Sequence, residues 1–245
     1  MTLSAEDPFD DFVLLTPRLI IIPTPIAVSL ASYRALYSDL HANVAFCEMA
    51  FGHHLPAERW SDSKTLEVIQ QRDIGRCWKP RGMGDFAVGR RMPSTPGSDP
   101  RVQDDRSELI ILRGQDLVRL AGPDNVYFEN IEWVGYAGVR DATTTSMPAR
   151  EPGDPALPSW REMVELRYGF SPQVWGTGVG QEAAKAVMQW AVGERGVLRF
   201  IAETERENER SGRVLKKLGF VSSATDYWKE PIVCKAQETI LGATA

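Results

Sequence analysis

Three glycines, Gly176, Gly178 and Gly180, follow a segment with the alternation of a strand and precede a segment with the spacing of a helix. The strand segment is 163–170, and the helix segment is 181–194. The first turn of a helix has free N–H groups and the positive end of the helix dipole, and glycine lets a phosphate approach the backbone. The order therefore predicts an anion-binding turn. The simpler alternative is a glycine turn with a purely structural role.

The spacing of these glycines differs from that of two common phosphate-binding loops. No Lys-Ser or Lys-Thr pair follows them, as a P-loop requires. Gln181 stands where the Gly-x-Gly-x-x-Gly dinucleotide motif has its third glycine. An enzyme that binds a nucleotide or a dinucleotide through this turn is therefore disfavoured.

A second motif begins at Asn208, after a segment, 198–205, that is typical of a strand. Apolar residues at positions 214, 215 and 218 share one face of a short helix, and Gly219 is placed to end it. Asn208 is a suitable N-cap for this helix. A capped surface helix followed by a strand is therefore the structural alternative to a functional role.

The two motifs resemble the signatures of the GNAT superfamily of N-acetyltransferases, and they lie in that family's order and separation. Trp175-x-x-Gly178-x-Gly180 is similar to the family's acetyl-CoA pyrophosphate loop, whose pattern is Gln/Arg-x-x-Gly-x-Gly/Ala. The second motif is similar to the family's Asn-x-x-Ser signature, which continues to Leu-x-x-x-Gly-Phe. The residues that match it are Asn208, Ser211, Leu215, Gly219 and Phe220.

Two further stretches resemble the RimJ/RimL branch of this superfamily. One is Trp175-Gly176-Thr177-Gly178 with Glu182-Ala183 behind it, and the other is Thr16-Pro17-Arg18-Leu19, which is similar to the opening strand of that branch. The resemblance covers residues from about 16 to 240, but its motifs are specific only over 165–184 and 208–220.

The resemblance implies the fold and the domain organisation. We expect an α/β (α+β) chain with the GNAT acyl-CoA N-acyltransferase fold, in which helices flank a central mixed, mostly antiparallel sheet. Residues 1–245 are expected to form a single domain of this kind, with loop insertions near 92–107 and 141–159, where Pro, Ser and charged residues are frequent.

The resemblance also implies the cofactor and its site. Acetyl-CoA is expected as the co-substrate, with its pantetheine arm between the fourth and fifth strands of the GNAT fold. A backbone N–H of Phe170 or its neighbour would then face the thioester oxygen. The residues expected to bind the cofactor are Phe170, Trp175, Gly176, Thr177, Gly178, Val179, Gly180, Asn208 and Ser211.

Acetyl transfer to an amine needs a group that takes the amine proton and a group that stabilises the leaving thiolate. Glu165 lies on the cofactor strand at a position that often carries an acid in this branch, so it is the expected base or the group that orders a base water. Glu162, Glu203 and Glu205 compete with it, and an exposed strand carboxylate is the structural alternative. Many family members have a tyrosine at position 215, where this chain has Leu215, so Ser211 is the expected partner of the thiolate.

Composition excludes several other classes of protein. The 245 residues carry a net charge of −5 without a basic block, which disfavours nucleic-acid binding. Cys47, Cys77 and Cys234 are odd in number and far apart, which argues against a disulfide framework and a zinc cluster, and no metal is expected. The longest apolar run, 19–22, is too short for a membrane span, and the polar N-terminus is unlike a secretory signal. A cytoplasmic protein is therefore expected.

The remaining elements follow from periodicity and breakers. We expect strands at 14–22, 84–91 and 131–140, helices at 26–40 and 57–72, and two last strands within 221–240. Segment 108–119 fits a strand or a short helix equally. His53 and His54 lie in a loop before Pro56, and by analogy with the family the stretch 47–60 is expected to set the specificity for the amine.

The leading interpretation is an N-acetyltransferase that passes an acetyl group from acetyl-CoA to a primary amine by direct attack in a ternary complex. The expected acceptor is the amine of a small molecule or of a protein N-terminus, and the enzyme is expected to be a monomer or a homodimer. The alternative is a non-catalytic module that binds acyl-CoA or a partner and has kept the fold, which the missing tyrosine leaves open.

Overall fold

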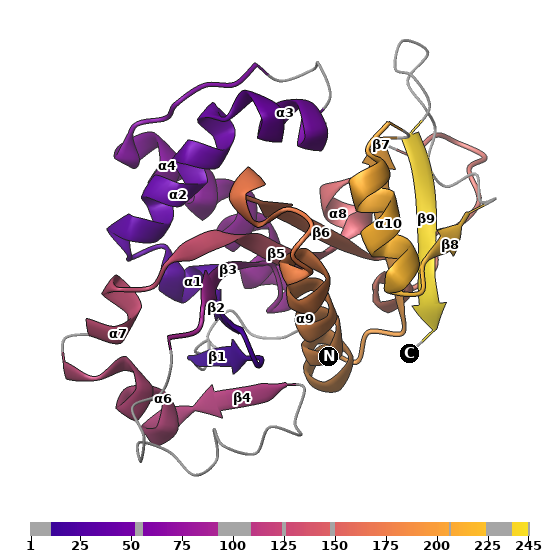
Figure 1. Cartoon of the computed structure of the whole chain (residues 1–245). Helices are drawn as coiled ribbons and strands as arrows, with labels where there is room; N and C mark the ends of the chain where they lie inside the picture. The colour runs from indigo at the N-terminus through magenta and orange to yellow at the C-terminus, as the bar shows by residue number, and fades with distance from the viewer. Residues whose placement is uncertain are drawn as a thin grey trace.

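The computed structural model describes residues 11–51, 56–92, 109–123, 126–147, 150–205, 207–223 and 237–244, the last segment by its backbone alone. They form one nine-stranded sheet in the order β4-β1-β2-β3-β5-β6-β7-β9-β8 (Figure 1). Neighbouring strands are antiparallel except β6 and β7, which are parallel. The predicted fold class, a mixed and mostly antiparallel sheet flanked by helices, is confirmed.

The strands, in chain order, are β1 (Phe12–Leu15), β2 (Leu19–Pro23), β3 (Asp85–Arg90), β4 (Ile110–Arg113), β5 (Trp133–Asp141), β6 (Val164–Phe170), β7 (Arg199–Glu205), β8 (Val221–Ser222) and β9 (Gln237–Thr244). The α-helices are α1 (Thr24–Ala27), α2 (Ala31–Ala42), α3 (Val44–Phe51), α4 (Asp62–Ile69), α5 (Lys79–Arg81), α6 (Gly114–Ala121), α7 (Val126–Glu129), α8 (Ala142–Thr145), α9 (Val179–Arg195) and α10 (Glu209–Lys217). A π-helix, η2 (Gln70–Trp78), and two 3-10 turns, η5 (Trp160–Glu162) and η6 (Pro172–Val174), complete the described elements.

Both faces of the sheet are covered, so its central strands are apolar on both sides. In β1, Phe12 and Leu14 belong to an apolar cluster with α9 and α10, whereas Val13 and Leu15 belong to a second cluster with α2, α3, α6 and α7. The helices α2, α3 and α4 lie together on one side in Figure 1, and α9 lies on the other side. The apolar run in the N-terminal strands is thus explained by burial on two faces.

Trp190 anchors α9 to the sheet. Its ring stacks on Phe12 with a centroid distance of 5.3 Å and meets the edge of Phe86 at 5.0 Å. Burying an aromatic or large aliphatic side chain contributes about 2 kcal/mol. Gly196, with φ 63°, ends the helix, while its first turn at Val179 has no side-chain N-cap. Trp190 therefore holds the later turns of the helix against the sheet, and no side chain caps the N–H groups of its first turn.

The predicted strand at 14–22 is wrong as a single element, because it is a hairpin. β1 and β2 pair through Leu14↔Ile21 and Leu15↔Ile20. The chain reverses at Thr16, whose N–H donates to the Leu19 carbonyl at 3.0 Å and whose hydroxyl oxygen accepts the Leu19 N–H at 3.0 Å. Apolar residues continue on both sides of this turn, so the hydrophobic pattern does not reveal it.

The predicted helix at 26–40 is divided into α1 and α2, although most of its apolar stripe is buried. Ser29 ends α1 by donating from its hydroxyl to the Ile26 carbonyl at 2.8 Å. The predicted helix at 57–72 begins later, after Ser61, whose hydroxyl accepts the Lys64 N–H at 3.2 Å. It then continues beyond its predicted end, because η2 extends the helical run to Trp78.

Other predicted elements agree more closely with the structure. Four predicted strands were found: 84–91 as β3, 131–140 as β5, 163–170 as β6 and 198–205 as β7. The predicted helix at 181–194 lies within α9. The undecided segment 108–119 contains a strand followed by a helix, β4 and α6. The predicted loop at 141–159 contains α8, which the Asp141 side chain caps. Residues 93–107, the pair His53 and His54, and 228–231 lie outside the described residues.

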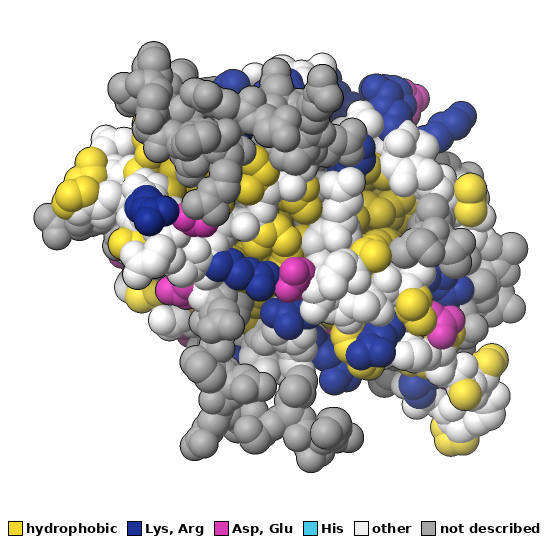
Figure 2. Space-filling model, turned by 90° about the horizontal axis from the view of Figure 1, so that it is seen from below, with side chains coloured by type: hydrophobic (Ala, Val, Ile, Leu, Met, Phe, Trp, Pro, Cys, Tyr) yellow, Lys and Arg dark blue, Asp and Glu magenta, His cyan; other side chains and the backbone are white. Residues whose placement is uncertain are grey.

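Charged side chains on the surface are often paired. Viewed from below in Figure 2, hydrophobic side chains gather near the middle of the face, and Lys and Arg side chains lie around them with Asp and Glu nearby. Arg113 and Glu194 form one such exposed ion pair, with 2.8 Å between nitrogen and oxygen. Among the described helices, none has both the length and the apolar character needed to cross a membrane.

A buried polar cluster joins η2 to β3. Asp73 accepts the Asp85 N–H at 2.9 Å through Oδ1, and its Oδ2 is hydrogen-bonded to the Thr24 hydroxyl. That hydroxyl also accepts from Trp78 Nε1 at 2.9 Å and donates to the Asp85 carbonyl at 2.9 Å. One hydroxyl proton cannot serve both acceptors, so a proton on Asp73 completes the cluster. Burial, with the charge of Asp85, raises the pKa of Asp73 well above its ordinary value.

Asp73→Asn should remove a pH dependence of stability. A buried acid with a raised pKa keeps its proton after the unfolded chain has released it near pH 4, so the free energy of unfolding falls as the pH rises through the folded pKa. Asparagine offers a donor to Thr24 and an acceptor to the Asp85 N–H. We expect urea unfolding between about pH 5 and pH 9 to show that the free energy of unfolding of the wild type falls as the pH rises. The exposed control Asp39→Asn should show the same fall, and Asp73→Asn should not. Parallel curves for all three proteins would contradict this account.

Candidate active site

β6 and β7 run side by side for only a short distance. They pair at Val164↔Phe200 and Glu165↔Ile201, and no further pairing joins their described residues. Beyond that point, 166–170 of β6 and 202–205 of β7 separate. We call this separation the fork. Backbone groups that face it have no neighbouring strand, so they need another partner or water.

The pairing of β6 with β5 determines which backbone groups face the fork. Alternate residues of an antiparallel strand direct their N–H and C=O groups toward the same neighbour. Ser171 donates its N–H to the Val134 carbonyl at 2.9 Å, in register with the β5–β6 ladder. The odd-numbered residues of β6 therefore bond to β5. The N–H groups of Tyr168 and Phe170 point the other way, toward the fork.

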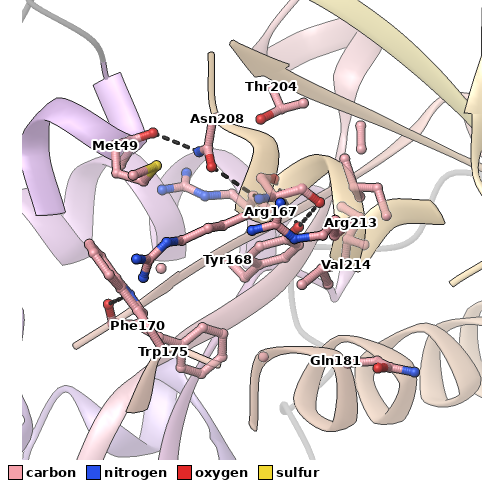
Figure 3. A pocket seen from close by; sticks show the side chains of 18 of the residues that line it. Met49, Arg167, Tyr168, Phe170, Trp175, Gln181, Thr204, Asn208, Arg213 and Val214 are labelled. Carbon is pink, nitrogen blue, oxygen red and sulfur yellow. Dashed lines mark hydrogen bonds between the residues drawn. The ribbon is translucent and has the colours of Figure 1, made fainter. Parts of the chain in front are cut away.

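A cavity of about 880 Å³ occupies the fork and reaches the start of α9. Its walls come from β6, β7, α3, α10 and the glycine turn at 176–180. In Figure 3, Trp175 and Gln181 lie toward one end of the cavity, and Met49 and Asn208 lie together across it. The volume is in the range of sites for small molecules and cofactors.

The glycine turn has the backbone that its sequence predicts. Gly176 and Gly178 have φ values of 79° and 83°, a region that strains residues with side chains. A Cβ on Gly176 would meet nothing within 4 Å, whereas a Cβ on Gly180 would lie 3.3 Å from the Phe170 ring. The turn is thus open on one side and packed on the other, and it leads into the uncapped first turn of α9.

Trp175 connects the glycine turn to the end of β6. Its indole Nε1 donates to the Phe170 carbonyl at 2.9 Å, which satisfies a backbone group at the fork. The guanidinium carbon of Arg210, on α10, lies 4.8 Å from the centre of the Trp175 ring. The arrangement brings a positive charge to the same end of the cavity as the N-terminus of α9.

The turn between β1 and β2 holds the start of α9 in place. Thr16 Oγ1 donates to Glu182 Oε1 at 2.6 Å, and Arg18 Nε donates to Glu182 Oε2 at 2.6 Å. Arg18 Nη1 also donates to the Thr177 carbonyl at 3.0 Å. Two stretches that sequence analysis picked out separately are therefore in direct contact, and together they fix the glycine turn.

Asn208 joins α10 to α3. Its side-chain oxygen accepts the Ser211 N–H at 3.0 Å, so it is the N-cap of α10, as predicted. Its side-chain nitrogen donates to the Met49 carbonyl at 2.7 Å, and Figure 3 shows this bond between the two helices. The residue therefore has a bridging contact in addition to capping, and it lines the cavity.

Ser211 has a partner that sequence analysis missed. The Tyr168 hydroxyl lies 2.9 Å from Ser211 Oγ, and both residues line the cavity. Burial raises the pKa of Tyr168 to about 12, against a lowering effect of the hydrogen bond with Ser211. Tyr168 shares the even-numbered face of β6 with Phe170, but no local pattern places it beside a residue of α10.

Glu165 is buried, with 7% of its surface exposed, and its carboxylate is fully engaged. Arg140 Nε donates to Oε2 and Nη2 donates to Oε1, each at 3.0 Å, and the Ser146 hydroxyl donates to Oε2. Such a two-pronged pair with a guanidinium is a strong, oriented interaction. The predicted role of Glu165 as a base is not tested by these contacts and stays a prediction.

Glu203, one of the competing carboxylates, has a different environment. It lies on β7 and lines the cavity, and its Oε1 is buried without a hydrogen-bond partner among the described residues. Burial raises the pKa of Glu203 to about 7, and the charges of Glu165 and Glu205 add to the rise while Arg140 opposes it. A buried acceptor without a donor is uncommon and calls for an explanation.

The other predicted cofactor residues divide into two groups. Phe170, Trp175, Gly176, Gly178, Gly180, Asn208 and Ser211 all line the cavity. Thr177 contacts the hairpin through its carbonyl, and the side chain of Val179 is buried in the core, so neither side chain is among the lining residues. Among the described residues, no group of three His, Cys, Asp or Glu side chains is placed to hold a metal ion.

Residues 127–221 match the family model described as the acetyltransferase (GNAT) domain. This segment contains the fork, the glycine turn and α10. A curated relative, the uncharacterized protein YkkB of Bacillus subtilis (strain 168), is 35% identical over 71 residues, which are 29% of this chain and 41% of that protein. The chain thus spans less than half the length of this relative. Residues 127–221 are thus similar to the GNAT acetyltransferase domain.

Solved structures share the fold of the whole chain at low identity. An acetyltransferase from Agrobacterium tumefaciens str. C58 has a TM-score of 0.53 at 16% identity, covering 99% of this chain and 98% of its own. A GnaT-family acetyltransferase from Bordetella pertussis has a TM-score of 0.56 at 16% identity, and the match covers 94% of this chain and 99% of that protein's chain. AAC(6')-Ib, in complex with ribostamycin and coenzyme A, has a TM-score of 0.52 at 11% identity, covering 95% and 93%. These likenesses establish the fold.

Arg18→Ala should loosen the glycine turn without unfolding the protein. The substitution removes the side-chain bonds of Arg18 to Glu182 and to the Thr177 carbonyl, and an exposed ion pair of this kind is worth about 1 kcal/mol. Amide hydrogen exchange at 176–182 should therefore become about fivefold faster. Arg90→Ala, which removes a comparable exposed pair with Glu132, is the matched control and should leave this segment unchanged. Equal exchange in both variants would show that the hairpin does not hold the turn.

Proposed function

We propose that the protein is an acetyl-CoA-dependent N-acetyltransferase that transfers an acetyl group to a primary amine. The observation that carries this proposal is the cavity in the fork, which leads to an uncapped helix N-terminus inside a GNAT acetyltransferase domain. A long ligand with an anionic end and a peptide-like arm fits such a site. Acetyl-CoA has both parts, since its pyrophosphate is anionic and its pantetheine arm contains amides.

The pyrophosphate would bind to the amides of the first turn of α9, at Val179 and Gly180, with Gly176 and Gly178 giving it access to the backbone. The positive helix end and Arg210 support an anion there. The pantetheine arm would lie in the fork in place of a strand, pairing with backbone groups of β6 that point away from β5. Acetyl-CoA would thus act as a co-substrate, and we propose the predicted residues for its binding, Thr177 and Val179 through their backbone.

Transfer would proceed by direct attack of the amine on the thioester in a ternary complex. The Phe170 N–H faces the fork, so it is a candidate donor to the thioester oxygen as negative charge develops on it. The amine must lose its proton before or during attack, and the carboxylates at the fork, among them the predicted Glu165, are the candidate bases. The reaction releases the thiol of CoA, so the leaving sulfur needs a hydrogen-bond donor.

Ser211 would provide that donor, supported by Tyr168. Leu215, at the position where many relatives of this fold have a tyrosine, is buried in the core and has no polar group to offer. The hydroxyl of Tyr168 reaches Ser211 from β6 instead. A serine hydroxyl is too weak an acid to transfer its proton easily, but a hydrogen bond from it still stabilises a thiolate.

The proposal extends to the acceptor, the branch of the family and the cellular setting. AAC(6')-Ib, which shares the fold, is named as an aminoglycoside acetyltransferase and was solved with ribostamycin, so a small amine is one acceptor to test. A protein N-terminus is the other. The contact of Thr16 and Arg18 with Glu182 supports placement in the RimJ/RimL-like branch, because it joins two stretches that resemble that branch. We also propose a cytoplasmic monomer or homodimer.

Acetyl-CoA should raise the unfolding temperature of the wild type, and ATP should not. A ligand at one hundred times its Kd stabilises the folded state by about 2.7 kcal/mol. Gly178→Asp should lose this shift, because a negative side chain would stand where the pyrophosphate binds. Gly178→Asn is the matched control: asparagine has the same size and tolerates the same φ, so it should keep most of the shift.

These outcomes separate the possible functions. No shift in the wild type at millimolar acetyl-CoA would remove the cofactor and with it the proposal. A shift without turnover on aminoglycosides, polyamines and peptides with free N-termini would favour the non-catalytic acyl-CoA-binding alternative. Equal behaviour of the Asp and Asn variants would mean that the turn does not recognise the negative charge of the cofactor.

Tyr168→Phe should lower turnover by about tenfold while leaving the affinity for acetyl-CoA nearly unchanged. The change removes one hydroxyl from the pair and keeps the ring in the core. Ser211→Ala should cost a similar factor, and the double variant should lose little more, because both residues act through one hydrogen bond. Steady-state kinetics with acetyl-CoA varied would measure these effects. Multiplicative losses in the double variant would mean that the two hydroxyls act separately.

A further inference from the structure

The two faces of the fork carry different chemistry. Successive strand residues alternate between faces. Tyr168 and Phe170 of β6 pack with the cluster beneath α9 and α10, and so does Ala202 of β7. Glu165 and Glu203 therefore share the opposite face, on which α3 packs near β6 and β7. A ligand arm in the fork has hydroxyl groups on one side and carboxylates on the other.

Of the two carboxylates, Glu165 has little capacity left for a substrate. Both of its oxygens accept hydrogen bonds from Arg140, and Ser146 adds a third. Taking a proton would break at least one of these charge-assisted bonds in a buried place, which is costly. Its geometry is that of a fixed ion pair between β6 and β5.

Glu203 has the capacity that Glu165 lacks. Its Oε1 is buried with no hydrogen-bond partner among the described residues, and other parts of the residue line the cavity. Leaving such an oxygen unpaired costs on the order of 1–3 kcal/mol, which a donor from a bound molecule would recover. The ammonium or amine group of an acceptor is such a donor.

We propose that Glu203 is the group that accepts the proton of the acceptor amine. This inference rests on the proposed acetyl transfer and assigns its base to β7, across the fork from the strand that holds the thioester. Glu165 and Arg140 then act as a fixed pair beside the base, and Tyr168 and Ser211 serve the leaving sulfur on the other face.

The proton and electron movements balance with this assignment. An ammonium group gives one proton to the Glu203 carboxylate, and the lone pair of the resulting amine forms a bond to the acetyl carbon. The carbon–sulfur bond breaks with its electron pair on sulfur. The nitrogen loses its second proton, which ends on the thiolate to give the CoA thiol, and Glu203 returns the first proton to water.

The charges around Glu203 suit this role near neutral pH. Burial raises its pKa to about 7, Glu165 and Glu205 raise it as well, and Arg140 opposes them. A base works best when its pKa lies near the working pH, because it is then both deprotonated and able to hold a proton. Since the deprotonated form is required, kcat should rise with pH through about 7.

The test compares three variants under saturating acetyl-CoA: Glu203→Gln, Glu165→Gln and Glu207→Gln. Each is assayed for acetyl transfer to ribostamycin, spermidine and a peptide with a free N-terminus, and for hydrolysis of acetyl-CoA by water, so that a rate exists without an amine. Glu203→Gln should lower kcat about 100-fold and remove the rise with pH. Glu207→Gln, an exposed residue in the turn after β7, should match the wild type.

The outcomes separate this inference from the proposed function. Glu203→Gln should keep the acetyl-CoA-dependent rise in unfolding temperature, which shows that the variant folds and binds the cofactor. The inference would be overturned if Glu203→Gln had the kcat and the pH profile of the wild type. It would also be overturned if Glu165→Gln were the only variant to lose the rise of kcat with pH. A wild type that neither binds acetyl-CoA nor turns it over would overturn the proposed function, and this assignment with it.

Discussion

The separation of β6 and β7 is the constraint on which the rest of the structure depends. A sheet of nine strands normally pairs its internal strands along their length, yet here two central strands pair at two positions and then part. Buried N–H and C=O groups cannot be left without partners at low cost. The indole of Trp175 satisfies the Phe170 carbonyl, and the groups that remain face a cavity instead of protein. The site is therefore an unfinished part of the sheet, and a ligand with amides is the natural complement.

Two hydrogen bonds fix the elements around the fork. The Tyr168–Ser211 hydrogen bond joins β6 to α10, and the Asn208–Met49 hydrogen bond joins α10 to α3. The two bonds together connect α10 to β6 and to α3 beside the fork. The glycine turn is fixed in a comparable way, because Trp190 anchors the later turns of α9 and Arg18 anchors its start. Exposed ion pairs contribute little to stability, so we interpret the contact of Arg18 with Glu182 as positional.

Sequence patterns predicted those parts of the site that are formed by residues close together in the chain. Two such parts depend only on residues that are neighbours in the chain: a strand, glycine turn and helix in series, and a short capped helix after a strand. Accordingly, β6, α9 and α10 were found where expected. The hairpin at Thr16 was missed because both of its strands are buried on two faces, which removes the alternation that marks a strand's limits. The contacts between Tyr168 and Ser211 and between Thr16 and Glu182 join residues far apart in the chain. Their spacing carries no trace of such contacts, so only the fold reveals them.

The same distinction explains why two carboxylates on one face of the fork differ. In sequence, Glu165 and Glu203 are both acids on strands, and nothing local ranks them. In the structure, the guanidinium of Arg140 lies against Glu165 and pairs with both of its carboxylate oxygens. If Glu165 were charged and unpaired, the repulsion between two neighbouring carboxylates would raise one pKa strongly, as in shared-proton pairs. With Arg140 in place, burial is the largest influence on Glu203, and its pKa stays near the neutral range. Burial is therefore the main reason why Glu203 takes and returns a proton near neutral pH, and the neighbouring ion pair has a smaller effect: Glu165 raises the pKa of Glu203 and Arg140 opposes that rise.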